Sequence, residues 1–393
     1  MTKITDIPAI RFKGFSDTWE QRKLGDVVDV RSGKDYKHLS EGNIPVYGTG
    51  GFMLSVNQAL SYDEDAIGIG RKGTIDKPYI LKAPFWTVDT LFYAIPREKV
   101  DLNFAFDVFQ NIDWKKKDES TGVPSLSKTA INEIDVLVPQ YDEQQPLGQF
   151  FNRIDNLITL HQRKYDKLTN VKKSMLEKMF PQNGSNAPEI RFKGFTEAWE
   201  QRKFGEVFDC TVPNNTLSRA ELSYDEGTVL NVHYGDVLIK YGSVLDVQKD
   251  DIPRIPHRCR EDFNGALLQD GDVIIADTAE DETTGKACEI GNLQGSAIVS
   301  GLHTMVCRPR NRMALGYLGY YLNSNAYHYQ LLPLMQGIKV LSLSRSNIQK
   351  TSVSYPSAMK EQQLIASYFS QLDHLITLHQ RKPNFYTGGY YAE

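Results

Sequence analysis

Three glycines in the segment GIGRKG, at residues 68, 70 and 73, have the spacing of a dinucleotide-binding loop. In such a loop the glycines open a helix whose N-terminus meets the pyrophosphate. The segment TIDKPYILKAP follows here, and its prolines, Pro78 and Pro84, are incompatible with a helix at that place. We therefore interpret residues 68–73 as a tight loop that carries Arg71 and Lys72, and not as a nucleotide site.

Other catalytic signatures are missing from the sequence. It contains no GxxxxGK[ST] loop for an NTP motor, no [DNS]PP[YFW] element that holds a target amine for methylation, and neither GxSxG nor HExxH. The histidines are scattered, and His161 and His379 occupy equivalent positions of a repeat, which favours packing or interhelical polar contacts. A nuclease built on acidic clusters remains an open alternative.

Polar and aromatic residues on glycine-containing loops are the remaining signal. Arg, Lys and Thr side chains are types that read base edges and grip phosphates, and loops often carry recognition. Each such loop taken singly is also typical of an ordinary solvated turn. The candidate DNA-binding residues are Tyr47, Thr49, Arg71, Lys72, Thr74, Trp86, Lys128, Lys240, Tyr241, Thr284, Lys286, Lys339 and Arg345.

The elements that must position these residues occur twice. Residues 10–25 (IRFKGFSDTWEQRKLG) return at 190–205 with twelve of sixteen positions identical. Residues 143–164 (EQQPLGQFFNRIDNLITLHQRK) return at 361–382 with thirteen of twenty-two identical, at an offset of 218. The segments between these frames do not match, although LSKTAINEIDVLVP (126–139) and LSRSNIQKTSVSYP (343–356) end both in a similar way. The sequence therefore predicts a duplicated scaffold whose two copies enclose different interior segments.

Composition is that of an ordinary globular protein. Hydrophobic residues make up 40% and charged residues 24% of the 393 positions, with a net charge of −4. Residues 1–180 carry 25 basic and 25 acidic side chains, and the remainder carries 20 and 24. Because a stand-alone non-specific DNA binder is usually strongly basic, any nucleic-acid contact here must be local or shared with a partner.

Targeting signals and cysteines add two expectations. The sequence has no run of eighteen apolar residues and no apolar signal core in MTKITDIPAIRFKG, which predicts a cytoplasmic protein without membrane contact. Its four cysteines form no CxxC pair, which predicts reduced thiols and no metal site.

The first repeated helix is expected to be long. Apolar positions recur from Leu147 to Met179 in steps of four and three, which is typical of a coiled-coil seam. Residues 146–180 would form a rod of roughly 50 Å. Such a helix can pack on its own domain, but an antiparallel pair with residues 361–382 is more economical for a rod of this length. The expected interhelix contacts are Phe151, Ile154, Ile158, His161, Phe369, Leu372, Ile376 and His379.

The second copy departs from the first after Lys382, where Pro383 stands at the place of Tyr165. We therefore expect the last sixteen residues of the first helix to lack an intrachain mate. Their apolar side chains would either fold back on the chain's own domains or bind a partner helix. These candidate partner-binding residues are Leu168, Val171, Met175, Leu176 and Met179.

Between the frames, short apolar runs such as DAIGIG and GDVIIAD alternate with Gly and Pro. Periodicity switches between two and 3.6, which predicts an α+β fold with an antiparallel or mixed sheet in each unit, and short helices at 103–112 and 313–323. The whole chain is then two tandem-duplicated α/β-mixed domains separated by long antiparallel coiled-coil helices, with pseudo-twofold symmetry.

The paired GF…WEQRK[LF]G openings and the paired EQQ…F…D…LITLHQRK helices resemble those of specificity subunits of type I restriction–modification systems, over nearly the full length. The resemblance implies a DNA sequence-recognition subunit without catalytic activity, in which each unit is a target recognition domain and the helices are conserved spacers. It implies a bipartite asymmetric double-stranded DNA target with an unread gap. A twofold arrangement suits the local symmetry of the DNA backbone.

The resemblance also implies partners and domain limits. Two methyltransferase subunits would methylate adenine at N6 with S-adenosylmethionine, and restriction/translocase subunits would use ATP and Mg²⁺, so that this chain itself holds no cofactor. The implied domains are residues 1–142 and 190–360 for recognition, 143–181 and 361–382 for the spacers, a linker at 182–189 and an atypical tail at 383–393. The main alternative is a coiled-coil adaptor or scaffold without DNA specificity.

Overall fold

A computed structural model describes residues 7–182 and 184–380 of the chain. The chain divides into two compact units, residues 1–160 and 161–393, and the boundary falls inside one continuous helix, α4 (Tyr141–Lys178). The last two residues of the predicted second spacer and the tail at 383–393 lie outside the described residues. Among the helices of the described part, none has the length and apolar content needed to cross a membrane.

The first unit contains two small sheets and a two-stranded ladder. An antiparallel sheet has the order β2–β8–β5–β6, and a second sheet has the order β4–β3–β7, with β3 and β7 parallel. The ladder pairs β1 with β9. The strands are β1 (Glu20–Lys23), β2 (Val28–Ser32), β3 (Glu41–Gly48), β4 (Gly51–Val56), β5 (Ala66–Gly70), β6 (Tyr79–Leu81), β7 (Trp86–Thr87), β8 (Leu91–Pro96) and β9 (Asp135–Val138).

Helices cover the core of the first unit. They are α1 (Leu24–Val27), α2 (Leu102–Asn111), the 3₁₀ helix η1 (Trp114–Lys117) and α3 (Lys128–Asn132). The sequence predicted α2 within one residue at each end. It begins where the Asp101 carboxylate accepts a hydrogen bond from the Phe104 amide at 3.0 Å, which is an ordinary N-cap.

The second unit repeats this plan with more elements. Its main sheet, in the order β11–β19–β15–β17–β13, is mixed, since β13 and β17 are parallel. The other sheets are β14–β12–β18, β16–β20 and the ladder β10–β21. The strands are β10 (Glu200–Lys203), β11 (Phe208–Asp209), β12 (Val229–Val232), β13 (Val244–Asp246), β14 (Arg254–Ile255), β15 (Val273–Ala276), β16 (Thr278–Ala279), β17 (Ala287–Gly291), β18 (Ala297–Ser300), β19 (Thr304–Pro309), β20 (Leu341–Ser342) and β21 (Ser352–Tyr355). The predicted antiparallel or mixed sheets are thus confirmed in both units.

Short helices connect the strands of the second unit. They are α5 (Phe204–Val207), η2 (Arg219–Glu221), α6 (Tyr234–Ile239), η3 (Arg260–Phe263), α7 (Tyr317–Leu322), α8 (Asn325–His328), η4 (Leu332–Leu334), α9 (Arg345–Ile348) and the long α10 (Met359–Gln380). The helix predicted at 313–323 is shorter than expected. Gly316 takes a left-handed φ of 90° just before α7, so the helix begins only at Tyr317.

In each unit the first repeated segment (residues 10–25 or 190–205) binds the second repeated segment (residues 143–164 or 361–382). Arg11 donates two hydrogen bonds of 2.6 Å to the buried Glu143 carboxylate at the start of α4. Arg191 and Glu361 make the same bidentate pair at 2.6 and 2.8 Å. Such paired contacts hold a planar guanidinium and a carboxylate in one geometry. The frames therefore recur because each fixes the start of a long helix on its own unit.

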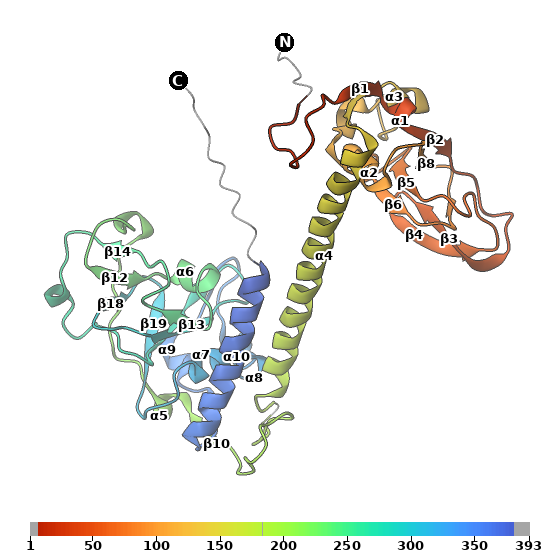
Figure 1. The fold of residues 1–393 in the computed structure, drawn as a ribbon. Coiled ribbons are helices and arrows are strands. Elements are labelled where there is room, and N and C mark those ends of the chain that lie inside the picture. The colour runs from red at the N-terminus through yellow and green to blue at the C-terminus, as the bar shows by residue number, and fades with distance from the viewer. Residues whose placement is uncertain (1–6, 183, 381–393) are drawn as a thin grey trace. The chain divides into compact units, whose positions relative to one another are not determined.

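In the second unit, α10 runs antiparallel to the C-terminal half of α4 (Figure 1). His161 and His379 meet with their Nδ1 atoms 2.9 Å apart. They are the same position of the repeat, so equivalent residues of the two helices meet at this point. Towards the other end of the contact, Phe180 stacks on Phe369 with ring centroids 5.7 Å apart. Of the residues expected at the interhelix contact, His161 lies against His379, Phe369 lies against Phe180, and Leu372 is buried in the core of the second unit.

Of the two alternatives for the last sixteen residues of α4, the structure shows the first, in which they pack on the chain's own domain. The expectation that they lack an intrachain mate was wrong. Leu168, Val171, Met175, Leu176 and Met179 pack against the core of the second unit, so they form no exposed partner-binding patch. The residues of α4 after His161 pack with the second unit, so its last sixteen residues are covered.

The first half of α4 is correspondingly exposed. Phe151 is 44% and Ile158 60% exposed, so the structure corrects both as interhelix contacts. Ile154 and Ile376 are half-buried. Phe150, Leu157 and Leu160 extend this apolar stripe with similar exposure.

A candidate nucleic-acid interface

The loop after the central strand of the first unit carries Arg71 and Lys72. Both side chains are exposed, and the Arg71 guanidinium lies 5.8 Å from the centre of the Phe92 ring. Gly70 has no room for a side chain, since a Cβ there would lie 1.9 Å from the Thr74 carbonyl oxygen. Gly73 turns the chain with φ of 93°. The glycines of GIGRKG thus build a strand end and a tight turn, as the sequence predicted.

A second basic position is equivalent in the two units. Lys128 opens α3 after Ser127, whose hydroxyl accepts from the Ala130 amide at 3.0 Å. Arg345 opens α9 after Ser344, whose hydroxyl accepts from the Asn347 amide at 3.2 Å. Both cations are exposed. The repeated LS[KR] sequence is therefore a helix cap that presents one cation at the same place in each unit.

The backbone joins these loops at one edge of each unit. In the first unit Lys72 forms an isolated bridge with Ser125, and the Leu126 amide donates to the Arg71 carbonyl at 2.9 Å. In the second unit β16 pairs with β20 through Thr278 and Ser342, and the Leu343 amide donates to the Asp277 carbonyl at 2.8 Å. The loop after the central strand and the capped helix thus lie side by side in both units.

The second unit adds an exposed loop at this edge. Gly337 has a φ of 126° and a Cβ there would meet the Val340 carbonyl oxygen at 1.9 Å, so the chain turns sharply between Gln336 and Ser342. Lys339 is exposed at its tip, and Ile338 is 100% exposed. Ile338 thus lies beside Lys339 on a loop that the sequence already indicated as a candidate.

The hairpin of β3 and β4 holds Tyr47 and Thr49. Tyr47 is half-buried, with its ring 6.1 Å from that of Tyr79, and Thr49 lies in the turn that Gly48 and Gly51 close. Two further side chains of this hairpin, Phe52 and Met53, are exposed and apolar.

Four of the predicted contact residues lie inside the protein. Trp86, Tyr241 and Thr284 are buried, and the Trp86 indole nitrogen donates to the Lys34 carbonyl at 2.9 Å. These residues fill the cores of their units and have no surface for DNA, which corrects the prediction. Lys286 is half-buried, and its ammonium donates to the Leu238 carbonyl at 2.9 Å. Burial lowers the pKa of this lysine, so it serves the packing of α6.

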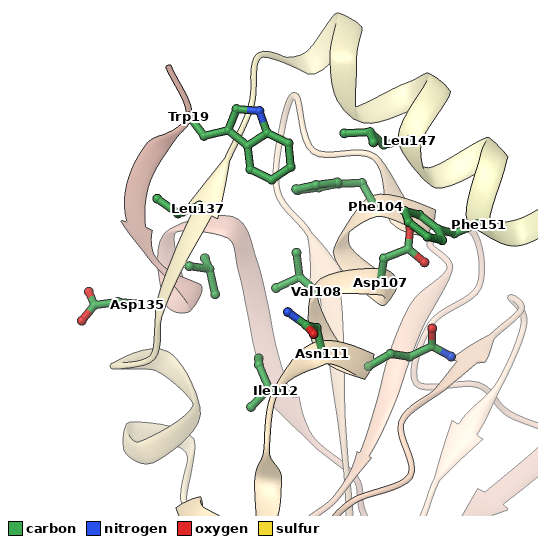
Figure 2. Close-up of a pocket in the computed structure, with 12 residues that line it drawn as sticks. Trp19, Phe104, Asp107, Val108, Asn111, Ile112, Asp135, Leu137, Leu147 and Phe151 are labelled. Carbon is green, nitrogen blue, oxygen red and sulfur yellow. The ribbon is translucent and has the colours of Figure 1, made fainter. Parts of the chain in front are cut away.

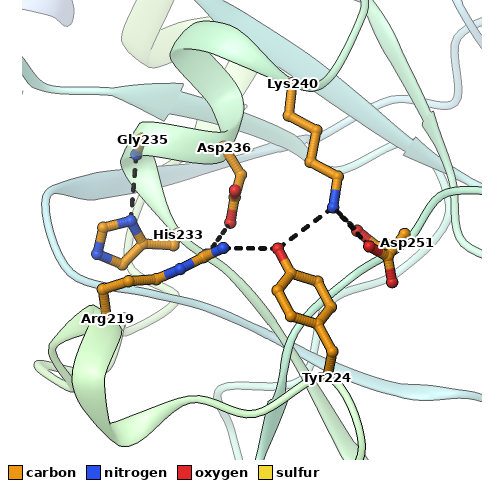
Figure 3. Close-up of polar contacts among 7 residues, drawn as sticks. All are labelled: Arg219, Tyr224, His233, Gly235, Asp236, Lys240 and Asp251. Atoms are coloured by element: carbon orange, nitrogen blue, oxygen red, sulfur yellow. Dashed lines mark hydrogen bonds and ion pairs between the residues drawn. The ribbon is translucent and has the colours of Figure 1, made fainter. Parts of the chain in front are cut away.

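Lys240 belongs to a polar network at the surface of the second unit. Figure 3 shows its ammonium between Asp251, at 3.0 Å, and the Tyr224 hydroxyl, at 3.2 Å. Arg219 reaches the same hydroxyl at 2.6 Å and pairs with the Asp236 carboxylate. With both cations engaged by carboxylates, the network has little charge to offer to a phosphate.

The remaining candidates, Arg71, Lys72, Thr74, Lys128, Lys339 and Arg345, are all exposed. Their contact with DNA stays a prediction. In residues 7–182 and 184–380, no group of three His, Cys, Asp or Glu side chains is arranged to hold a metal ion. All four cysteines are free thiols.

The chain is similar to known proteins in both sequence and fold. The chain is 21% identical to the MjaVIII specificity subunit of a type I restriction enzyme from Methanocaldococcus jannaschii, over 93% of this chain and 88% of that protein. Its fold is similar to that of the type I restriction–modification S subunit from M. genitalium, with a TM-score of 0.57 at 12% identity, covering 95% of this chain and 93% of the other.

The family described as type I restriction modification DNA specificity domain matches the sequence twice, at residues 16–170 and 196–385. The two matches correspond to the two copies of the duplicated frame, and together they cover most of the chain. The chain therefore belongs to the DNA specificity subunits of type I restriction–modification systems, which recognise DNA and are not themselves catalytic.

Proposed function

We propose that this specificity subunit reads a bipartite, asymmetric double-stranded DNA target, one part with each unit. The proposal rests on the observation that both units have an equivalent edge, where the loop after the central strand lies beside a capped helix. A capped helix presents Lys128 in one unit and Arg345 in the other, beside loops that differ in length and sequence. The repeated part would set the same orientation on the phosphate backbone, and the different loops would read different bases.

We further propose that partner subunits catalyse the reactions of the complex. Two methyltransferase subunits would transfer a methyl group from S-adenosylmethionine to adenine N6, and restriction/translocase subunits would use ATP and Mg²⁺. The near-neutral charge of the chain supports this division, since phosphate binding by such a complex would draw on cations of several subunits.

Exchange of one recognition unit tests the modular part of the proposal. Residues 26–125 lie between β1 and α3, inside the repeated frame, and can be replaced by the same segment of another specificity subunit. We expect only one half of the target to change when methylated adenines are mapped in DNA modified by the assembled complex. A change in both halves, or in neither, would contradict independent reading.

The salt dependence of DNA binding tests whether the loop of Arg71 and Lys72 contacts phosphates. Changing Arg71 and Lys72 together to Ala should reduce the slope of log K against log salt by about one to two phosphate equivalents. Lys99→Asn is the matched control, because Lys99 is also exposed, follows the opposite end of β8, and has a φ of 60° that asparagine tolerates. Equal slopes in the double variant and the control would show that this loop does not contact DNA phosphates.

The length of α4 is proposed to set the gap between the two half-sites. Seven residues inserted between Asn156 and Leu157 lengthen the helix by about 10 Å and keep the seam in phase. Since DNA rises about 3.4 Å per base pair, the gap should grow by about three base pairs with unchanged half-sites. An active variant that keeps the original gap would separate helix length from spacing.

An adaptor that only joins proteins is the alternative function. A gel shift with the methyltransferase subunits present distinguishes the two. We expect tight, sequence-selective binding with those subunits, whereas an adaptor would show no selective shift, and cleavage by the chain alone would indicate a nuclease.

A further inference from the structure

A pocket of about 750 Å³ lies in the first unit between α2, the ladder of β1 and β9, and the first turns of α4 (Figure 2). Its walls are largely apolar, with Trp19 and Phe104 on one side and Leu147 and Phe151 of α4 on another. No side chain of the described residues fills it. Phe151, one of its walls, belongs to the exposed stripe of α4.

Two buried polar atoms at this pocket have no hydrogen-bond partner within the described residues. They are the Trp19 indole nitrogen and the Oδ2 atom of Asp107. Burial, with smaller contributions from Asp155 and Asp101, raises the pKa of Asp107 to about 7. Unpartnered buried polar groups are rare in folded proteins and are costly. The equivalent Trp199 indole donates to Glu361 of its own unit at 3.3 Å, so the Trp19 indole does not by itself require an occupant. The Asp107 carboxylate has no cation partner among the described residues, and an incoming cation would complete it.

The second unit contains the same site in a completed form. Trp199 corresponds to Trp19 in the first frame, and Phe369 corresponds to Phe151 in the second frame. Tyr317 corresponds to Phe104, because each packs edge-on against its tryptophan with ring centroids 6.1 Å apart. The register also agrees in the backbone, where the Gln144 and Gln362 side chains accept from the Asp101 and Ala314 amides, both at 2.9 Å.

Phe180 fills the site in the second unit. It comes from the C-terminal end of α4, is fully buried, and lies within 6.3 Å of the rings of Trp199, Tyr317, Tyr321 and Phe369. Met179 beside it is also buried. A helix end that carries Met-Phe is therefore the kind of group that this site accepts.

The charged residues around the site also correspond between the two units. In the second unit the Lys172 ammonium of α4 pairs with Asp373, which also accepts a hydrogen bond of 2.8 Å from the Tyr320 hydroxyl. By the same register, Asp155 corresponds to Asp373 and Asp107 to Tyr320. The first unit thus has two carboxylates where the second has one carboxylate and a phenol. An incoming lysine would find more negative charge there, not less.

The sequence shows why this match is open to another polypeptide. At the repeat offset of 218, Tyr390 stands at the place of Lys172, and Pro383 with Gly388 and Gly389 does not favour a helix there. Residues 383–393 therefore do not have the sequence of the helix that this site would accept.

We propose that the pocket beside Trp19 is a docking site for the C-terminal end of an amphipathic helix supplied by another polypeptide. That helix runs antiparallel to α4 and carries a lysine eight residues before a phenylalanine, as Lys172 and Phe180 do. The lysine pairs with Asp155 and Asp107, the phenylalanine enters between Trp19 and Phe104, and the apolar face of the helix covers Phe151 and Ile158. The site requires no DNA, so its test is independent of the proposed function.

The probe is the chain's own repeat. A fluorescein-labelled peptide of residues 163–181, RKYDKLTNVKKSMLEKMFP, is titrated onto the full chain and followed by fluorescence anisotropy. We expect saturable binding that weakens at least tenfold when Phe180 of the peptide is changed to Ala. A loss of that size is reasonable for an aromatic anchor in a desolvated pocket. Absence of saturable binding would overturn the proposal.

Variants of the chain locate the bound peptide. Val108→Trp fills the pocket and should abolish binding, whereas Val123→Trp, at an exposed position outside it, should not. Because Val108→Trp can disturb folding, a charge exchange provides an independent check. The peptide Lys172→Glu should bind poorly to the native chain and regain affinity for the Asp155→Lys chain. Failure of that rescue would show that the lysine does not meet Asp155.

Two further outcomes would name a different occupant. Concentration-dependent dimerisation of the chain without peptide, lost in Val108→Trp, would assign the pocket to a second copy. Binding that occurs only after residues 383–393 are deleted would assign it to the chain's own tail. Either result would overturn the choice of a separate polypeptide.

Discussion

Phe369 and Phe151 occupy the same position of the repeat, yet Phe369 is fully buried and Phe151 is 44% exposed. The difference does not come from their own helices, because both belong to the same seam. It comes from the opposite helix, which brings Phe180 to one phenylalanine and nothing in the described residues to the other. A coiled-coil seam thus acquires its stability from residues far away in sequence.

The largest expected difference concerns these two phenylalanines. Phe369→Ala leaves a cavity among Phe180 and Tyr320 and should destabilise the second unit by about 3–5 kcal/mol. Phe151→Ala should cost the first unit less than about 1 kcal/mol, since its side chain is partly in water. Unfolding in urea, followed by hydrogen exchange of peptides from each unit, measures both. Equal costs would mean that the first pocket is closed in solution.

The next contrast concerns the pH dependence of stability. Asp107 of the first unit occupies the position of Tyr320 in the second unit. The pKa of Asp107 is raised to about 7 in the folded unit, against about 4 in an unfolded chain. The folded state therefore holds a proton that the unfolded state releases. The contribution of Asp107 to the stability of the first unit should therefore be fully present below about pH 4 and be lost as the pH rises through 7, with a size of about 1–2 kcal/mol after allowing for partial exposure.

Asp107→Asn is the matched variant for this effect. It should flatten the pH dependence of urea unfolding of the first unit between pH 4 and 8, and leave the second unit unchanged. If the native chain and the variant show the same pH dependence, another group is responsible.

A smaller contrast is expected between Asp373 and Asp155. Asp373 pairs with Lys172 at a partly exposed site, so Asp373→Asn should destabilise the second unit by about 0.5–1 kcal/mol. Asp155→Asn should be neutral or slightly stabilising, because Asp155 has no cation partner among the described residues and repels Asp107. Paired urea titrations measure the two changes, and a clear loss in Asp155→Asn would indicate an unrecognised partner.

The smallest effect is expected at the centre of the helix pair. Partial burial, with Lys164 and His161 nearby, lowers the pKa of His379. A lowered histidine pKa favours the neutral form in the fold, so this contribution is present above about pH 6.5 and is lost as the pH falls further. NMR titration of His379 should show the lowered value in the native chain and a value closer to normal in His161→Asn. An unchanged pKa in that variant would make the His161 contact unimportant.

Recognition of the loops from sequence was partly correct. Arg71, Lys72, Lys128, Lys339 and Arg345 are exposed, as glycine turns and LS[KR] caps indicated. Trp86, Tyr241 and Thr284 were misplaced because a residue beside a glycine turn can point outward or inward, and only the packing of the unit decides which. The Arg11–Glu143 and Arg191–Glu361 pairs were not predicted, although both partners lie in the repeated frames.

The sequence by itself determined the duplication, the presence of the two long helices and the mixed helix and strand content of each unit. These follow from identity at fixed offsets and from periodicity, which are local properties. The tertiary structure decided which half of α4 is covered and which aromatic site is filled. The physical reason is that an antiparallel pair joins residues on opposite sides of His161 and His379. Phe180, after His161, is therefore buried against Phe369, whereas Phe151, before His161, stays exposed.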